Sequence, residues 1–482
     1  MSSVKTNIIL NGLNTITGIV FPVITFPYAA RILLPEGIGT VNFLNSIVCY
    51  IILVSTLGIP MYAVKEIAKC RDNKAARDQF TVEILMLSGL LCLCAYVLVW
   101  ALAKFVPQIH QAQTLFYILS LSILFSSIGV EWFYQGIEDF KFITIRALII
   151  RTLAAASLFV FVRSSSDLIA YGCIVVGSTV GNYLANFVHL RKYISLKNMN
   201  FRGLRILRHL KPALNVFVLN LIISLYIQLN SIMLGFISGD EAVGFFTAGN
   251  KISTIGLTLI TSLGTVLLPR CSHLIKSGDM DGFSSVIKKS LSLTISIALP
   301  MTVGLMVLAT PVTMIFCGQE FRDSISVLYI TAPVIVFISL TNLMGIQILY
   351  PMDKVRLVIL SVSGGAVMNL LLNFLLIPSL GAVGAAVSTF IAELTVLFLQ
   401  IVLGRKYYPF RISALINHKV IIATGVMGLA VYVSRMLTSA YLTQLIVGLS
   451  VGLCVYSATL WMLRDTVIIE IVDLVKTKIK SL

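Results

Sequence analysis

Three cations lie inside long apolar segments of the sequence: Arg146, Arg151 and Lys251. A charge in a hydrocarbon layer costs at least about 2.5 to 3.5 kcal/mol on insertion scales, so each one needs a partner or a function. Arg151 lies about 12 Å inside its segment at a rise of about 1.5 Å per residue, and Lys251 lies roughly as deep from the opposite surface. Arg151 is the stronger candidate for binding an anion, whereas Arg146 suits an interfacial anchor equally well because it can reach the surface.

The deepest carboxylate is Glu393, on one helical face with Thr389 and Gln400. Its depth suits a role in coupling to protons or sodium ions, and an ion pair with one of the buried cations remains an alternative. Glu83 and Glu131 lie closer to the segment ends, where solvation or pairing with Arg146 is the simpler explanation.

Polar side chains also follow helical spacing inside the apolar segments. Such a face must look at protein or at water, so it predicts either interhelical packing or a hydrated cleft. The first stripe holds Asn11, Asn14, Gly18, Pro22 and Thr25, and the longest holds Thr247, Lys251, Thr254, Thr258, Thr261 and Thr265.

The composition requires that these side chains be positioned by membrane helices. Of 482 residues, 58% are hydrophobic and 12% are charged, about half the charged fraction of a soluble domain. Reading apolar runs of about 20 residues, we predict about fourteen transmembrane helices in an all-α polytopic membrane protein. They cover approximately 8–33, 40–64, 80–103, 114–135, 143–163, 168–190, 212–237, 244–269, 290–316, 325–350, 357–378, 382–404, 420–438 and 443–463.

The net charge of +16 would suggest nucleic acid as a partner for a soluble chain, but its distribution indicates membrane topology instead. Most Lys and Arg residues fall in alternate connections, which are the cytoplasmic ones if the N-terminus is cytoplasmic. The positive-inside rule therefore predicts that both termini are cytoplasmic and that the chain binds no nucleic acid.

A basic connection between Arg191 and Lys211 divides the chain. We predict an N-terminal six-helix lobe with its linker (1–211), a C-terminal six-helix lobe (212–419), and two extra helices with an amphipathic tail (420–482). Residues 36–47 and 241–252 share Glu36/Glu241, Gly39/Gly244, Asn45/Asn250 and Ile47/Ile252. Each stretch opens the second helix of its lobe, which predicts a pseudo-twofold axis along the membrane normal with a substrate path between the lobes.

Motifs for catalysis and cofactor binding are missing from the sequence. There is no phosphate-binding Gly-x-x-x-x-Gly-Lys-Ser/Thr loop and no His-Glu-x-x-His, and no predicted outer loop exceeds about ten residues. The cysteine and histidine spacing suggests neither a disulfide framework nor a metal site. We expect no cofactor, no metal and no enzymatic activity.

Three stretches resemble the Wzx-type lipid-linked oligosaccharide flippases of the multidrug/oligosaccharidyl-lipid/polysaccharide exporter superfamily: FPVITFPYAARILLPEGIGTVNFLNSI (21–47), LGIPMYAVKEIAKCRDNK (57–74) and EWFYQGIEDFKFITIR (131–146). The resemblance implies movement of an undecaprenyl-diphosphate-linked repeat unit from the inner to the outer leaflet of a bacterial cytoplasmic membrane. It also implies two six-helix lobes around a central cleft. The extra helix pair is similar to that of lipid II flippases, where it helps to form a groove for the lipid tail.

The mechanism that follows is alternating access by rocking of the lobes. We hypothesise that the substrate is bound by Arg151 with Arg146, Lys251 and Arg31, and by Asn11 and Asn14. Glu393 would couple the cycle to H⁺ or Na⁺. Expected partners are membrane lipids, a polysaccharide polymerase and a chain-length regulator. Two alternatives stay open: a cation-coupled exporter of drugs or metabolites on the same fold, and a membrane enzyme of polysaccharide assembly.

Overall fold

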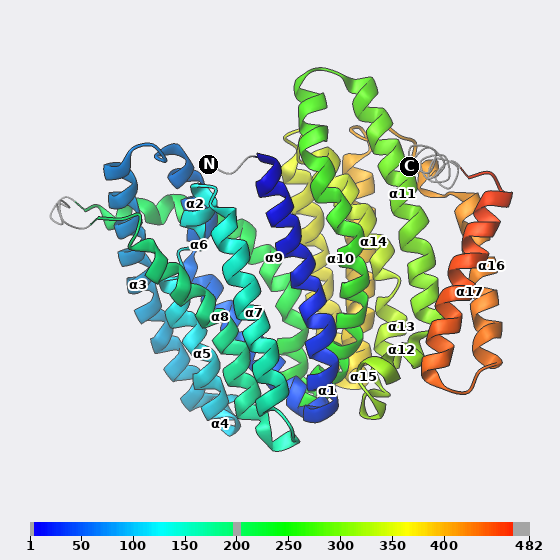
Figure 1. Cartoon of the computed structure of the whole chain (residues 1–482), viewed down its shortest axis with the longest axis horizontal. Coiled ribbons are helices and arrows are strands. Elements are labelled where there is room, and N and C mark those ends of the chain that lie inside the picture. Colours follow the sequence, from blue (N-terminus) through cyan, green and yellow to red (C-terminus); the bar gives the residue numbers. More distant parts are fainter. Residues whose placement is uncertain (1–3, 196–203, 466–482) are drawn as a thin grey trace. The chain divides into compact units, whose positions relative to one another are not determined.

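A computed structural model describes residues 4–195 and 204–465, and within these ranges the chain is helical and contains no strand (Figure 1). In the same ranges, 11 helices are long and apolar enough to cross a membrane. The prediction of an all-α polytopic membrane protein is therefore confirmed. Arg202 of the linker and most of the predicted amphipathic tail lie outside the described residues.

The chain forms two compact units, Met1–Gly244 and Phe245–Leu482. The contacts thus group the helix that begins at Leu210 with the first unit, whereas the sequence placed it at the start of the second lobe. The lobe boundary at residue 211 and the pseudo-twofold axis remain predictions.

In the first unit, the long helix α1 is central and packs against α3, α5, α7 and α9. Figure 1 shows α3, α5, α7 and α8 running alongside one another. The helices of this unit are α1 (Val4–Thr56), α2 (Ile59–Lys69), α3 (Lys74–Phe105), α4 (Pro107–Gln111), α5 (Gln113–Ser127), α6 (Glu131–Gly136), α7 (Phe140–Phe161), α8 (Leu168–Leu190) and α9 (Leu210–Ile237), with short 3₁₀ turns η1 (Ser165–Asp167) and η3 (Ile206–His209).

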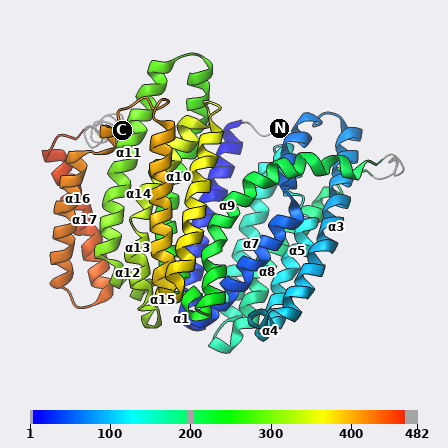
Figure 2. The ribbon, with the colours of Figure 1, turned by 180° about the vertical axis from the view of Figure 1, so that it is seen from behind.

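In the second unit, α15 packs against α13 and α14, and α11 contacts α14 and α16. Figure 2 shows α16 and α17 side by side as the predicted C-terminal pair. The elements are α10 (Asp240–Lys276, beginning at the end of the first unit), α11 (Met280–Val307), α12 (Ala309–Phe316), η4 (Gln319–Phe321), α13 (Ser324–Thr331), α14 (Val334–Asn342), the π-helical turn η5 (Leu343–Leu349), α15 (Val355–Gly404), η6 (Ile412–Leu415), α16 (His418–Met436) and α17 (Tyr441–Met462).

Two kinks account for two of the three differences between the fourteen predicted spans and the 11 helices, and the third is the predicted span 212–237, of which the shorter apolar helix Ile227–Ile237 is found. Helix α1 is broken at Leu34, where φ is 62° before Pro35, and α15 is broken at Gly381, where φ is 52°. Each kink falls between two predicted spans, so α1 and α15 each contain two of them. The predicted span 40–64 extends too far, because Leu57 and Gly58 both have positive φ and end α1 at Thr56.

The two glycines that match between the repeated segments touch each other's helix. A Cβ added at Gly39 would lie 1.7 Å from the carbonyl oxygen of Asp240, and one added at Gly244 would lie 2.0 Å from that of Pro35. Asp240 and Pro35 each precede the matching glycine by four residues, so the contact is reciprocal. Thr40 Oγ1 adds a hydrogen bond to Asp240 Oδ2 at 2.5 Å. The sequence repeat therefore has a structural counterpart that depends on the missing side chain at both positions.

Candidate substrate-binding site

Arg151 projects from α7 toward the polar stripe of α1. Its Nη1 donates a hydrogen bond to Thr17 Oγ1 at 2.8 Å, and the guanidinium lies beside Gly18, where an added Cβ would be 3.6 Å from Nη2. Both Arg151 and Thr17 are half-buried. The predicted ligand cation therefore lies, within one unit, beside Gly18 of the first polar stripe and the adjacent hydroxyl of Thr17.

Arg146 is held differently, although it lies five residues earlier on the same helix. It is buried, with 7% of its surface exposed, and its Nη2 forms an ion pair with Glu131 Oε2 at 2.8 Å. Its Nη1 donates to the side-chain oxygen of Asn186, and the ring of Phe142 lies 5.8 Å from the guanidinium carbon. The predicted pairing of Glu131 with Arg146 is present, which makes Arg146 a positioning residue rather than an open cation.

The remaining candidates of the first unit all lie on α1. Asn11 and Asn14 are in its first turns, but their side chains lie outside the described residues. Arg31 is exposed, three residues before the kink at Leu34. The structure thus places the three on one helix without testing their roles as ligands.

Lys251 is half-buried in α10, on the face of the long threonine stripe. The hydroxyls of Thr254 and Thr258 donate to the carbonyl oxygens of Asn250 and Thr254, one turn back in the same helix, at 2.8 and 2.7 Å. The neighbouring Ser253 pairs with Thr331 of α13 at 2.9 Å. The hydroxyls of Thr254 and Thr258 are thus satisfied within their own helix, and a hydrated face and interhelical packing both stay open as interpretations of the stripe.

Glu393 is buried in the second half of α15, with 6% of its surface exposed. The same helix buries three amides completely or almost completely, those of Asn369, Asn373 and Gln400. Amides and a carboxylate are the oxygen donors that small cations use. Helix α15 therefore buries a carboxylate and three amides, the kinds of side chain that ion coupling requires.

Gln347 is a buried polar residue that the sequence reasoning missed. It lies in the π-helical turn η5, and its Nε2 would be 2.8 Å from a Cβ added at Gly264 of α10. Among the described residues, Gln347 Oε1 and Gln400 Oε1 have no hydrogen-bond partner. Helical spacing in the sequence did not reveal Gln347, because a π-helical turn shifts side chains away from the regular spacing of an α-helix.

Glu83 is paired with the linker and not with Arg146 or solvent, as the sequence had suggested. The side chain is fully buried, and its carboxylate accepts a hydrogen bond from the backbone N–H of Arg205 at 3.0 Å. Arg208 Nη2 and His209 Nε2 lie 2.6 and 2.7 Å from its Oε2. The linker end is thereby fixed to α3, a contact that helical spacing could not reveal because the linker is irregular.

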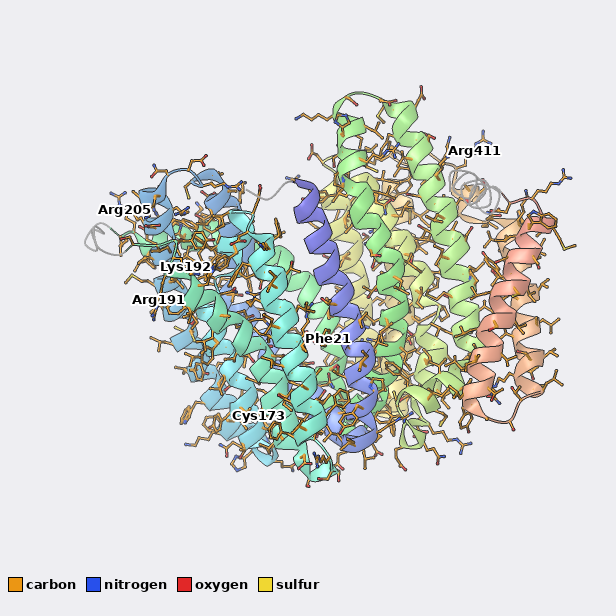
Figure 3. All side chains as sticks on the ribbon, viewed as in Figure 1. Phe21, Cys173, Arg191, Lys192, Arg205 and Arg411 are labelled. Carbon is orange, nitrogen blue, oxygen red and sulfur yellow. The ribbon has the colours of Figure 1, made fainter. Side chains whose placement is uncertain are left out.

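The basic connection itself lies at one end of the first unit. Figure 3 shows Arg191, Lys192 and Arg205 toward that end, whereas Cys173 of α8 lies toward the other. Nearby, the Tyr193 hydroxyl donates to Asp139 Oδ2 at 2.9 Å, and burial raises the pKa of Tyr193 to about 12. The Tyr193 phenol therefore stays protonated and keeps the end of α8 against the start of α7 at neutral pH.

An apolar groove in the second unit lies between α11, α12, α16 and α17. It has a volume of about 400 Å³ and is lined by Pro300, Met301, Leu305, Val431, Leu449 and Tyr456, among others. The C-terminal helix pair forms one of its walls. A chain of hydrocarbon is the ligand that such a lining would favour.

Residues 4–275 match the family described as "Polysaccharide biosynthesis protein". The chain is 26% identical over 409 residues to the "Putative O-antigen transporter" of Escherichia coli (strain K12), covering 84% of this chain and 97% of that one. It is also 24% identical over 186 residues to "Lipid II flippase MurJ" of Bacillus subtilis (strain 168), covering 38% of this chain and 34% of the relative.

Two solved structures share the fold. A lipid II flippase MurJ in an inward closed conformation has a TM-score of 0.77 at 16% identity, covering 95% of this chain and 100% of the other. An inward-facing MATE family multidrug resistance transporter has a TM-score of 0.65 at 15% identity, and the alignment covers 80% of this chain and 93% of the transporter. The family match over residues 4–275 spans more than half of the sequence, and the chain therefore belongs to the polysaccharide biosynthesis protein family.

Proposed function

We propose that this protein is a flippase that moves undecaprenyl-diphosphate-linked oligosaccharide repeat units from the inner to the outer leaflet of the bacterial cytoplasmic membrane. Membership of the polysaccharide biosynthesis family and the similarity to an O-antigen transporter support a lipid-linked oligosaccharide as the cargo. The single observation that carries the proposal is the contact of Arg151 with Thr17 and with Gly18 of the polar stripe of α1. It places a cation of one membrane helix against the polar face of another.

Moving a charged headgroup across the membrane requires cations such as Arg151 inside the protein. A diphosphate and its sugars cannot cross hydrocarbon unaided, because the desolvation of the charges is prohibitive. Arg151, assisted by Lys251 and Arg31, would offset this cost at the headgroup, with Asn11 and Asn14 as donors to sugar hydroxyls. Arg146, neutralised by Glu131, would fix the orientation of α7. The polyprenyl tail would remain in lipid or enter the apolar groove.

Coupling to an ion gradient is a second part of the proposal. Glu393 is buried in α15, which also buries three amides, and a carboxylate inside a membrane helix can exchange a proton or Na⁺. Rocking of helical bundles would then alternate access to the cargo. A cation-coupled drug or metabolite exporter remains the alternative, and it would tolerate the loss of Arg151.

The test is transport by the purified protein in vesicles loaded with a defined undecaprenyl-linked oligosaccharide. Appearance of the glycan in the opposite leaflet is followed with and without an imposed H⁺ or Na⁺ gradient. We expect Arg151→Glu to reduce transport at least a hundredfold, since it replaces attraction for the diphosphate with repulsion, and Arg151→Lys to retain part of the activity. A gradient should accelerate transport by the unaltered protein.

The matched control is Arg163→Glu, which reverses an exposed charge just beyond the end of α7 and should leave transport unchanged. Size-exclusion chromatography checks that each variant is folded, and Arg151→Gln replaces the charge reversal if it is not. Wild-type transport by a folded Arg151→Glu protein would exclude Arg151 from the site.

A further inference from the structure

A second cavity of the second unit, here called the basic pocket, lies at the end of α11 opposite Val307. Its volume is about 490 Å³, and its lining includes Lys288, Leu291, Ile295, His418, Lys419 and Asp465. These residues come from residues 288–295 of α11, the start of α16 and the third residue beyond α17. Figure 3 shows Arg411, from the segment that leads into α16, at the same end of the unit. The pocket is therefore built from three separate parts of the chain.

The charges of the basic pocket are arranged by depth. Lys288, His418 and Lys419 are exposed, whereas Asp465 is buried with 2% of its surface exposed. Lys419 Nζ donates to the carbonyl oxygen of Arg464 at 3.0 Å, which fixes that ammonium at the rim. The backbone N–H groups of Lys419 and Val420 are already capped by the Asn417 side chain. The lysine ammonium groups therefore make the mouth of the pocket attractive to anions.

The walls of the basic pocket include an apolar part beside the polar Ser292, Asn417 and Asp465. Leu291 and Ile295 contribute from α11, and Ile416, which is 57% exposed, contributes from the segment before α16. One residue further along α11, Ser296 begins the lining of the apolar groove. A free inorganic anion would gain nothing from these side chains, whereas an anion attached to hydrocarbon would bury its first carbons against them.

We propose that the basic pocket binds the phosphodiester headgroup of an anionic membrane phospholipid, with the glycerol and first acyl carbons against Leu291 and Ile295. Basic pockets between membrane helices recognise such headgroups through lysine and arginine near the membrane surface. The ligand is a resident lipid, so the inference does not depend on the transported substrate. The lipid would join the extra helix pair to α11 at this end of the unit.

The experiment is native mass spectrometry of the full chain in detergent, titrated with phosphatidylglycerol or with phosphatidylcholine of the same acyl chains. We expect the unaltered protein to retain phosphatidylglycerol at least tenfold more tightly. Lys288→Ala combined with Lys419→Ala should weaken that binding about thirtyfold, because each lysine near an anionic headgroup contributes roughly a factor of five. Lys288→Arg with Lys419→Arg should keep it within about threefold.

The control variant Lys65→Ala with Lys141→Ala removes two exposed lysines from the first unit and should leave binding unchanged. Glycerol phosphate without acyl chains is the competitor that distinguishes a lipid from a soluble anion. Equal retention of the two lipids, unchanged binding in the double alanine variant, or displacement by millimolar glycerol phosphate would each overturn the proposal. If the double alanine variant does not fold, Lys288→Ala alone must weaken binding about fivefold.

Discussion

Arg146 and Arg151 show how two identical side chains on one helix can serve different purposes. Arg146 has an ion pair, an amide partner and an aromatic neighbour, whereas Arg151 donates a hydrogen bond to the hydroxyl of Thr17. Arg151 is also less buried than Arg146, so in the proposed site it is the arginine that a phosphate reaches more easily. An arginine already paired with a carboxylate would have to break that pair first.

The Arg146 and Glu131 pair should respond unequally to removal of either partner. The Arg146 side chain is 6% exposed and that of Glu131 is 38% exposed. We expect Glu131→Gln to lower the free energy of unfolding by about 2 kcal/mol, because it leaves a buried cation without its counter-charge. Arg146→Met should cost only about 1 kcal/mol, since water can solvate the remaining carboxylate.

The measurement is denaturant unfolding in detergent micelles, with the double variant completing a thermodynamic cycle. We expect the double variant Glu131→Gln with Arg146→Met to regain part of the free energy of unfolding that Glu131→Gln alone loses. Equal losses in the two single variants would contradict the asymmetry of burial.

At the scale of the elements, the contact between α1 and the start of α10 leaves no space for a side chain. We expect Gly39→Ala or Gly244→Ala to destabilise the protein by about 3 kcal/mol or more, because a methyl group would overlap a backbone carbonyl that cannot rotate away. The shift of the melting temperature in detergent measures the effect.

Gly177→Ala is the matched control for this pair. Gly177 lies inside α8 with no atom within 4 Å of an added Cβ, so alanine there should be neutral or stabilising by up to about 1 kcal/mol. A neutral Gly39→Ala variant would show that the two helices can separate at this point at little cost.

Elements were predictable from the sequence where local chemistry determines them. The apolar runs located the spans, the gap between 33 and 40 contains the break in α1, and Gly18 of the predicted stripe lies beside Arg151. Three features were not predicted from the sequence. The partners of Glu83 come from the end of the linker, and the amide partner of Arg146, Asn186, lies 40 residues further along the chain. Gln347 lies in a π-helical turn. Each depends on tertiary packing, which periodicity within one segment does not encode.

At the scale of the whole molecule, the distribution of basic residues predicts an orientation in the membrane that labelling can test. Lys141 begins α7 and Ser166 lies just beyond its other end, and both are exposed. In a cysteine-free background, a membrane-impermeant maleimide added to intact cells should label Ser166→Cys and leave Lys141→Cys unlabelled, because positive connections stay in the cytoplasm.

Permeabilised cells provide the control, since both variants should then react. Labelling of Lys141→Cys in intact cells would invert the predicted topology. It would also reverse the proposed direction in which the cargo enters.

The reciprocal contact of Gly39 and Gly244 has an evolutionary consequence. Most positions of the two matching segments can change singly, but here the backbone of each segment is the surface against which the other must fit. A larger residue at either glycine would meet an unaltered carbonyl oxygen, and no single second substitution could remove a main-chain atom. Related chains should therefore keep both glycines even where the surrounding sequences of the two segments differ.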